Sequence, residues 1–196
     1  MLTLYVVRHG QSESNRAGVY CGWGQVSLTE KGIIDALRAG DHLAGVRFDQ
    51  VYTSDLKRAV QTCELALPEV DFVQSQLLRE VNMGSLCGLS YAQALQKYGD
   101  IHRQHLSNRD FTTYGGENTA MQYDRTVQFL SFLEKMKIEG NVAVFCHEGT
   151  IKCMLSHILQ SKIPWSRYSV DNGAVTTFFW NGEYWNLKTW NFTGKL

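Results

Sequence analysis

Two runs of apolar residues in this chain each end abruptly at a histidine that is followed by a small turn. Residues 2–7 lead into Arg8 and His9, and residues 142–146 lead into His147. Runs of this length and composition are typical of strands buried on both faces of a parallel sheet. Open parallel sheets bind ligands where the carboxyl ends of the strands meet. The pattern therefore predicts that both histidines and the arginine face one crevice, which is suited to an anion.

The rest of the chain alternates between helical and strand periodicity. The predicted helices span residues 28–43, 56–67, 118–137 and 150–160, and the predicted strands span 48–53 and, more weakly, 71–74. Thr29 and the Ser54-Asp55 pair lie where caps of the first two helices are expected. The tail alternates around Asn181-Gly182, which predicts a hairpin.

Residues from about 77 to 117 break this rhythm, and we interpret them as a cap-like insertion over the sheet edge, with helical pieces over 90–98 and 100–108. Strands that alternate with helices place the chain in the α/β class. We predict a three-layer α/β/α sandwich whose sheet is mostly parallel, with an antiparallel strand at one edge. A length of 196 residues suits a single domain over residues 1–196.

The charge balance limits the classes of partner. Lys plus Arg and Asp plus Glu both number 19, so attraction to a phosphate must come from a local cluster, and we expect no nucleic-acid partner. We expect no membrane partner either, since no apolar run approaches the ~20 residues that span a bilayer. Five cysteines without C-x-x-C spacing, and an N-terminus without a signal-type segment, indicate a cytoplasmic protein with free thiols.

The Arg8-His9-Gly10 turn offers the parts of a phosphate site. The guanidinium presents a planar fork of donors that matches phosphate oxygens, and Gly10 allows a ligand to approach the backbone closely. Taken alone, the triplet also fits a structural histidine at a strand end with a surface arginine.

Three further features favour a functional interpretation of this turn. Arg58 lies in the first turn of the helix after the strand at 48–53, so it can reach over the same sheet edge. His147 follows another strand end, beside a helix N-terminus whose dipole favours an anion. Glu80 follows in a loop that can overhang the crevice. Together these residues form a candidate phosphate pocket with an acid/base attached.

An ordered series of short motifs supports this interpretation over nearly the whole chain. The motifs are residues 7–15 (VRHGQSESN), 28–32 (LTEKG), 52–62 (YTSDLKRAVQT), 78–80 (LRE) with Gly84 and Gly88, 115–118 (GGEN) and 146–149 (CHEG). With them the chain resembles the histidine phosphatase superfamily, the group named after cofactor-dependent phosphoglycerate mutase. Each motif alone is weak, but their order along the chain is specific.

The resemblance implies a role for each matching residue. His9 is the expected nucleophile, which forms a phosphohistidine, while Arg8, Arg58 and His147 hold the phosphoryl oxygens. Glu80 is the expected general acid and then base, which requires a raised pKa. Asn15 is an expected further donor in the pocket. The resemblance implies no cofactor, and no metal-ligand spacing is present.

The loop at Cys21 and Gly22 is expected to border the substrate, and it bears on the choice between hydrolase and mutase. Cys21 stands where mutases carry a substrate-contacting threonine, and the residues after Glu80 lack the mutases' Arg-rich stretch. The chain looks closer to α-ribazole phosphatases, so we expect a metal-independent phosphoric monoester hydrolase. α-Ribazole phosphate, sugar phosphates and other small phosphorylated metabolites stay open as substrates. The alternatives are a phosphoglycerate mutase-type phosphotransferase and a catalytically weak relative that binds phospho-ligands.

Other polar residues receive plainer interpretations. For His102, Arg103, His105 and Arg109 we weigh two interpretations, a lining of the substrate mouth and a solvated cap helix, and we favour the solvated helix. Glu148 departs from the small residue that many relatives place there, and we expect it to point away from the phosphate or to shape substrate choice. The aromatic tail hairpin leaves both a monomer and a homodimer open.

Overall fold

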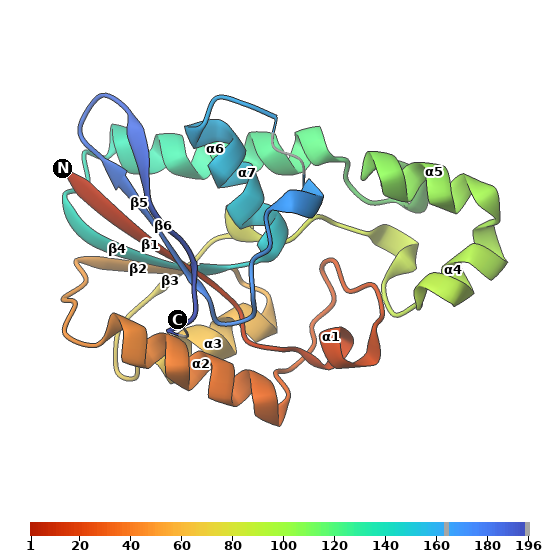
Figure 1. Cartoon of the computed structure of the whole chain (residues 1–196), viewed down its shortest axis with the longest axis horizontal. Coiled ribbons are helices and arrows are strands. Elements are labelled where there is room, and N and C mark those ends of the chain that lie inside the picture. The colour runs from red at the N-terminus through yellow and green to blue at the C-terminus, as the bar shows by residue number, and fades with distance from the viewer. Residues whose placement is uncertain (163–164, 195–196) are drawn as a thin grey trace.

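A six-stranded sheet forms the centre of the computed structural model, which describes residues 1–162 and 165–194 (Figure 1). Its order is β3-β2-β4-β1-β5-β6. The strands are β1 (Leu2–Arg8), β2 (Gln50–Thr53), β3 (Val73–Gln74), β4 (Gly140–Cys146), β5 (Val175–Trp180) and β6 (Trp185–Phe192). Strands β1 to β4 pair in parallel, whereas β5 pairs antiparallel with both β1 and β6. The carboxyl ends of β1, β2 and β4 therefore meet at one edge.

The register of the two central strands decides where the histidines lie. β1 and β4 pair without a shift, from Leu2 opposite Gly140 to Arg8 opposite Cys146. Both strands thus end at the same level, and His9 follows one of them while His147 follows the other. The amide of His9 donates to the carbonyl of Cys146 at 3.0 Å, which continues the pairing one residue beyond the strand.

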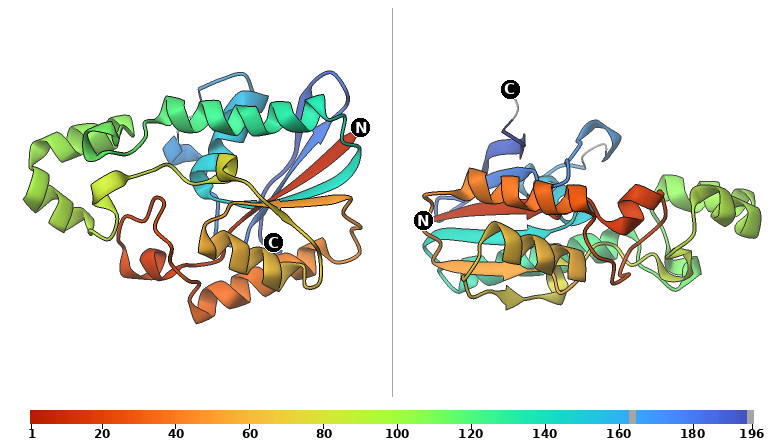
Figure 2. Two further views of the ribbon diagram at one scale, coloured as in Figure 1. Left: turned by 180° about the vertical axis from the view of Figure 1, so that it is seen from behind. Right: turned by 90° about the horizontal axis from the view of Figure 1, so that it is seen from below.

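Helices cover both faces of the sheet (Figures 1 and 2). α2 (Glu30–Leu43) and α3 (Lys57–Ala66) lie on one face, and α6 (Thr119–Lys135) and α7 (Glu148–Ile158) lie on the other. A hydrophobic core lies on each face of the sheet. Alternate residues of β1 pack into one core or the other, because successive side chains of a strand point to opposite faces. Leu4 and Val6 pack with Phe129 of α6, whereas Val7 packs with Leu43 of α2.

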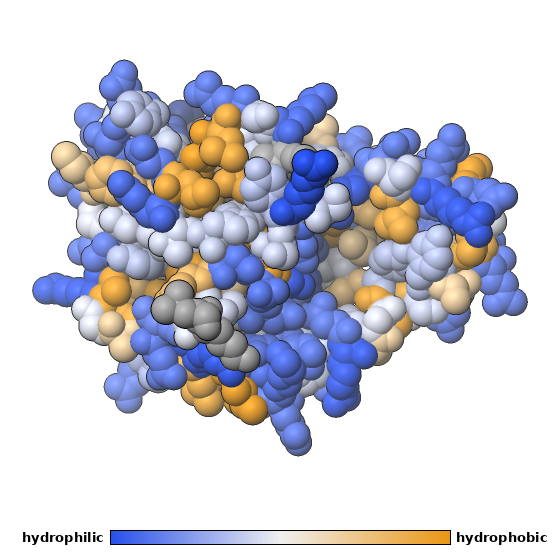
Figure 3. Space-filling model, viewed as in Figure 1, coloured by the Kyte–Doolittle hydropathy of each residue, from blue (hydrophilic) through white to orange (hydrophobic). Residues whose placement is uncertain are grey.

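The insertion forms a cap beyond the carboxyl edge of the sheet. It contains α4 (Tyr91–Tyr98) and α5 (Asp100–Asn108), which lie at the right of Figure 1. Phe111 and Tyr114 pack with Val81 and Leu86 in a small core of the cap's own. The space-filling view shows the cap as a lobe, with a hollow between it and the main body (Figure 3).

The structure confirms the predicted α/β sandwich and refines it in two places. The antiparallel strand is β5, one position in from the edge, because the tail hairpin adds β6 outside it. A short helix, α1 (Glu13–Ala17), was not predicted; it begins with a capping box between Ser12 and Asn15. No helix in residues 1–162 and 165–194 is long and apolar enough to cross a membrane.

Cap predictions were right for one helix and wrong for another. Thr29 caps α2, where its hydroxyl accepts from the amide of Gly32 at 3.0 Å. Ser54 and Asp55 do not cap α3, whose N-cap is Leu56 and has no side-chain hydrogen bond. Both side chains are engaged elsewhere, Ser54 with His147 and Asp55 with Arg79.

Candidate active site

His9 is buried at the end of β1, where three hydrogen bonds hold it in addition to the backbone bond to Cys146. Its Nδ1 lies 2.7 Å from the carbonyl oxygen of Gly10, so this nitrogen carries the proton and donates it. Its Nε2 therefore has a lone pair, toward which the Nε–H of Arg58 points at 3.2 Å. Asn172 holds the backbone by donating to the carbonyl of His9 at 2.9 Å. Burial, with the charges of Arg58 and Arg8, lowers the pKa of His9 well below its ordinary value, so the ring is neutral at neutral pH.

His147 lies beside His9, with the two ring centroids 5.1 Å apart. Its Nε2 lies 2.9 Å from the hydroxyl of Ser54. Its Nδ1 is buried and has no hydrogen-bond partner among the described residues. Burial and the charge of Arg58 lower the pKa of His147 well below its ordinary value. A buried polar atom without a partner is costly, so Nδ1 is poised to receive a ligand.

Arg58 reaches from the first turn of α3 to the same point and is almost wholly buried. Besides His9, it donates to the carbonyls of Gly22 and Gly24, both at 2.9 Å. The Sγ of Cys21 lies 3.4 Å from its Nη1. The loop containing Cys21 and Gly22 therefore fixes the position of the guanidinium.

Arg8 and Asn15 occupy more open positions. The Nη1 of Arg8 donates to the carbonyl of Val170 and lies 3.2 Å from Oε2 of Glu148, while its buried Nε has no partner among the described residues. Asn15 is exposed on α1, where its Oδ1 accepts from the amide and hydroxyl of Ser12. The structure thus brings His9, His147, Arg58 and Arg8 together at the strand ends and leaves Asn15 at the rim.

Glu80 lies over this cluster and is held by donors from three elements. Oε1 accepts from the amide of Val81 at 2.8 Å and from Nε2 of Gln122 at 2.9 Å, and Oε2 accepts from the amide of Gly149 at 3.1 Å. The glycine at 149 allows this close approach, because a Cβ there would lie 2.1 Å from Oε1 of Glu80 and would displace the carboxylate. The carboxylate sits at the N-terminus of α7, where the helix dipole favours negative charge.

The ionisation of Glu80 differs from the prediction. Burial raises the pKa of its carboxyl, but the charge of Arg109 and the three hydrogen bonds outweigh burial, and the net pKa lies below the ordinary value. The expectation of a raised pKa is therefore wrong, and Glu80 is ionised. The expectation followed from the role of general acid, whereas the pKa is set by a cation and N–H donors that outweigh burial.

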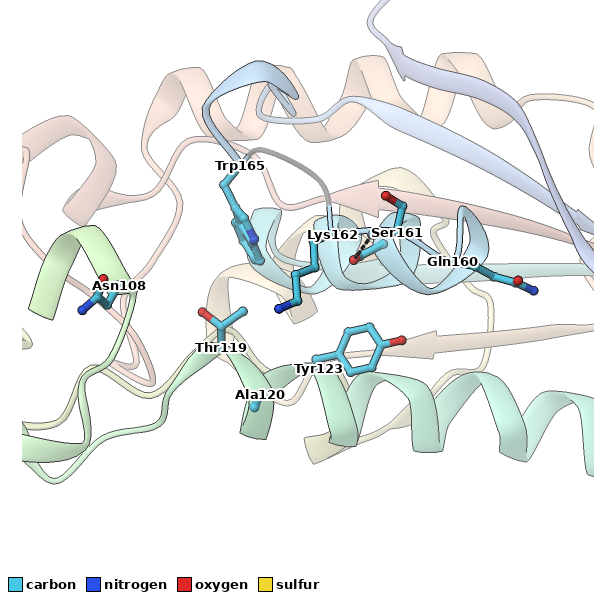
Figure 4. Close-up of a pocket in the computed structure, with 9 residues that line it drawn as sticks. Asn108, Thr119, Ala120, Tyr123, Gln160, Ser161, Lys162 and Trp165 are labelled. Carbon is cyan, nitrogen blue, oxygen red and sulfur yellow. Dashed lines mark hydrogen bonds between the residues drawn. The ribbon is translucent and has the colours of Figure 1, made fainter.

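Two cavities open at the cap side of the site. The smaller, of about 160 Å³, is lined by Glu80, Met83, Arg109, Glu148, Gly149 and Trp165. The larger, of about 680 Å³, lies between α5, α6 and α7, and Trp165 contributes to its wall as well (Figure 4). Among residues 1–162 and 165–194, no group of three or more His, Cys, Asp or Glu side chains is arranged to hold a metal ion.

Comparison with known proteins agrees with this geometry. The family model of the histidine phosphatase superfamily (branch 1) matches residues 4–193. The chain belongs to the histidine phosphatase superfamily. A 2,3-bisphosphoglycerate-dependent phosphoglycerate mutase of Streptococcus sanguinis is 32% identical over 195 residues, which cover 82% of this chain and 85% of that protein.

Two solved structures show the same fold as this histidine phosphatase. The α-ribazole phosphatase of Shigella flexneri superposes with a TM-score of 0.89 at 23% identity, over 97% of this chain and 96% of its own. YhfR of Bacillus stearothermophilus superposes with a TM-score of 0.89 at 24% identity, over 97% of both chains. These likenesses concern the fold, and hydrolases and mutases share it.

Sequence reasoning missed several residues of this histidine phosphatase site. Ser54, Gln122 and Asn172 orient His147, Glu80 and His9, respectively, and nothing in the sequence marks them for these tasks. The interpretation of the cap residues as solvated is wrong for His102, and for Arg109 the structure agrees with the alternative of a lining position. Arg109 lines the smaller cavity, and His102 is buried with its ring nitrogens beside the hydroxyls of Tyr20 and Tyr114.

Proposed function

We propose that this histidine phosphatase hydrolyses a small phosphomonoester through a phosphohistidine on Nε2 of His9, without a metal ion. The observation that supports the proposal most is the state of that nitrogen: the ring is neutral, its other nitrogen is bonded to Gly10, and its lone pair faces the buried guanidinium of Arg58. A buried, oriented lone pair amid cations is suited to attack on an anionic phosphoryl group.

The first step forms a bond from Nε2 of His9 to phosphorus and breaks the bond from phosphorus to the ester oxygen. The phosphoryl oxygens then replace some present contacts of Arg58 and Arg8, and they give Nδ1 of His147 the partner that it lacks. These donors are already in place, so charge that moves between the oxygens is stabilised with little reorganisation.

Glu80 delivers the proton to the departing alkoxide. Since Glu80 is ionised in the free protein, the proton must arrive with the substrate, whose monoanion is common near the second phosphate pKa of about 6. A phosphate in the pocket also raises the pKa of the neighbouring carboxyl, because like charges disfavour ionisation. In the second step Glu80 takes a proton from the attacking water, the bond from nitrogen to phosphorus breaks, and inorganic phosphate leaves.

A phosphoglycerate mutase is the second candidate, and the similarity to the streptococcal mutase favours it. A mutase must retain its phosphorylated intermediate and let a bisphosphate turn without meeting water. The charges on the leaving-group side support hydrolysis instead, because Arg109 is the sole Arg or Lys that lines this space within the described residues. A bisphosphate needs more cations than this.

The test compares the wild type with His9→Ala. The wild type should release phosphate from p-nitrophenyl phosphate and from a panel that includes α-ribazole phosphate and sugar phosphates, in the presence of a metal chelator. The variant should release none, and only the wild type should show an acid-labile phosphohistidine after rapid quenching. Equal rates for the two proteins would reject the proposal.

A second assay separates the alternatives. Conversion of 3-phosphoglycerate to 2-phosphoglycerate that depends on added 2,3-bisphosphoglycerate, without net release of phosphate, would establish the mutase. Binding of phosphorylated compounds without turnover of any of them would establish a phospho-ligand-binding relative.

A further inference from the structure

Two of the five cysteines lie close together where the main body meets the cap. A Cβ built on Gly24 would lie 2.8 Å from Sγ of Cys87 and 3.4 Å from Sγ of Cys21. Since both sulfurs lie this close to one point, they are only a few ångströms from each other. Both cysteines are free thiols.

Backbone hydrogen bonds hold the two cysteines near each other. The loop after α1 runs antiparallel to the segment at the start of the cap (Figure 1). The amide of Tyr20 donates to the carbonyl of Leu89 at 2.9 Å, and its carbonyl accepts from the amide of Gly88 at 2.8 Å. Cys21 and Cys87 are the next residues on the two segments. A disulfide bond, about 2.05 Å long, therefore requires only a local approach of the two side chains.

Cys21 has the surroundings of a reactive thiol. Thiols that react with oxidants are partly exposed and lie beside a cation. Cys21 is half-buried, and its Sγ lies 3.4 Å from Nη1 of Arg58. Cys87 is an exposed residue, so an oxidant or a reductant can reach the pair. Partial burial of its sulfur, together with the neighbouring Cys21, raises the pKa of the Cys87 thiol, which makes Cys21 the thiol that reacts first.

The other three cysteines lack these features. Cys63, Cys146 and Cys153 are at most 1% exposed. Burial raises the pKa of each of these thiols, and thiols buried in apolar surroundings are inert. Oxidation is therefore directed to Cys21 and Cys87.

The pair is linked to phosphate binding through Arg58. The loop after α1 supplies three contacts that hold this guanidinium: Sγ of Cys21 at 3.4 Å, and the carbonyls of Gly22 and Gly24, both at 2.9 Å. Closing a bond between Cys21 and Cys87 moves Sγ of Cys21 and the loop that carries the two carbonyls. Arg58 donates to the phosphoryl oxygens in the proposed reaction, so a change in its position weakens the hold on phosphate.

We propose that Cys21 and Cys87 are a site of reversible oxidation, at which a hydroperoxide forms a disulfide that displaces Arg58 and weakens phosphate binding. The sulfur of Cys21 attacks one oxygen of the hydroperoxide, the O–O bond breaks, and the other oxygen leaves with the thiol proton as water or an alcohol. The sulfur of Cys87 then attacks the sulfenic acid of Cys21, the S–O bond breaks, and the hydroxyl group leaves as water with the proton of Cys87. The two thiols lose two electrons, which reduce the hydroperoxide.

The experiment treats the reduced protein with hydrogen peroxide in the absence of other thiols. The remaining thiols are then alkylated, and disulfide-linked peptides are identified by mass spectrometry. The expected product links Cys21 to Cys87 and leaves the three buried cysteines reduced. Dithiothreitol should convert this product back to the free thiols.

Binding of inorganic phosphate, measured by calorimetry, shows the consequence for the site. Oxidation should raise the dissociation constant for phosphate about 10- to 100-fold, which is the size expected when a charged hydrogen-bond donor is misplaced. It should lower kcat/KM for p-nitrophenyl phosphate in parallel. Dithiothreitol should restore both quantities.

Two variants separate the disulfide from general oxidation. Cys87→Ser lacks the second thiol: it should bind phosphate like the wild type when reduced, form no cross-link, and keep most of its affinity after peroxide. Cys63→Ala is the matched control, which removes a buried cysteine of α3 and should respond to peroxide as the wild type does. Cys87→Ala replaces Cys87→Ser if that variant does not fold.

The outcomes separate this inference from the proposed function, on which only its effect on turnover rests. Suppose that the reduced protein hydrolyses p-nitrophenyl phosphate, but peroxide forms no link between Cys21 and Cys87, or a link that leaves phosphate affinity unchanged; the oxidation site is then overturned and the hydrolase stands. An equal loss of affinity in Cys87→Ser and the wild type also overturns the site. If the reduced protein hydrolyses no ester but binds phosphate, and the cross-link weakens that binding, the hydrolase is overturned and the oxidation site stands.

Discussion

Replacement of Gly149 by alanine tests how Glu80 is positioned. The new Cβ would lie 2.1 Å from Oε1 of Glu80 and 2.6 Å from Nε2 of Gln122. The carboxylate must retreat by about 1.3 Å to reach an ordinary contact of 3.4 Å, which lengthens its hydrogen bond to the amide of residue 149. The backbone itself tolerates the change, since Gly149 lies inside α7 without a positive φ.

The magnitude follows from that displacement. A misplacement of about 1 Å in a reacting group costs on the order of 100-fold in rate, which corresponds to about 2.7 kcal/mol of transition-state stabilisation. Gly149→Ala should therefore lower kcat/KM for an alkyl phosphate about 100-fold. The loss should be smaller for p-nitrophenyl phosphate, whose leaving group needs less protonation. Inhibition by inorganic phosphate should hardly change, because His9, Arg8 and Arg58 keep their places.

Steady-state kinetics on both esters, with inorganic phosphate as the competitive inhibitor, provide the measurement. Gly45→Ala is the control for a general loss of stability: the space around Gly45 is open, but its φ of +80° strains an alanine there, at a position far from the site in sequence. The reasoning is refuted if Gly149→Ala retains wild-type activity on alkyl phosphates, or if it loses phosphate binding in parallel with turnover.

Three further predictions follow from the charges and caps. The kcat/KM should fall about tenfold per pH unit above pH ~6, as the substrate monoanion disappears. It should persist below pH 6.5, because the lowered pKa of His9 keeps that ring neutral. A bell-shaped pH profile centred above pH 8 would contradict this. Since the folded pKa values of His9 and His147 are both lowered, stability should be complete above the unfolded pKa and decline below pH ~6.5, by at most about 1.4 kcal/mol per pH unit for each ring. Urea titrations at several pH values measure this decline, and a flat profile between pH 7 and 5 argues against buried neutral rings. Thr29→Ala, which removes the cap of α2, should cost about 1 kcal/mol of unfolding free energy in the same titrations, and an unchanged midpoint would show that the cap contributes nothing.

The part of the fold that depends on short-range patterns could be predicted from the sequence. The apolar runs before His9 and His147 gave β1 and β4, and helical spacing after Thr29 gave α2, because side-chain period and cap chemistry are local properties. The hairpin at Asn181-Gly182 followed for the same reason. The predictions failed where long-range contacts compete for a side chain: Ser54 looked like a cap, but the hydroxyl is used by His147.

In the candidate site, too, the residues could be predicted from local patterns, whereas their protonation states depend on long-range contacts. The sequence nominated His9, His147, Arg8, Arg58 and Glu80 through their places at strand ends and in ordered motifs, and the structure brings these residues together. The protonation states of these residues could not be predicted from the sequence, because a pKa depends on burial and on charges from distant segments of the chain. The depressed pKa of Glu80 reflects Arg109 of the cap and the amide of Gly149 at once.

By itself, the sequence determined most of the strands and helices and the candidate histidines, arginines and carboxylate that follow them, since these features are encoded by residues near one another in the chain. Only the tertiary structure decided that β5 lies inside β6, that Glu80 is ionised, and that Glu148 and Arg109 share one cavity. Those facts depend on through-space distances between residues far apart in sequence, and no local pattern encodes them.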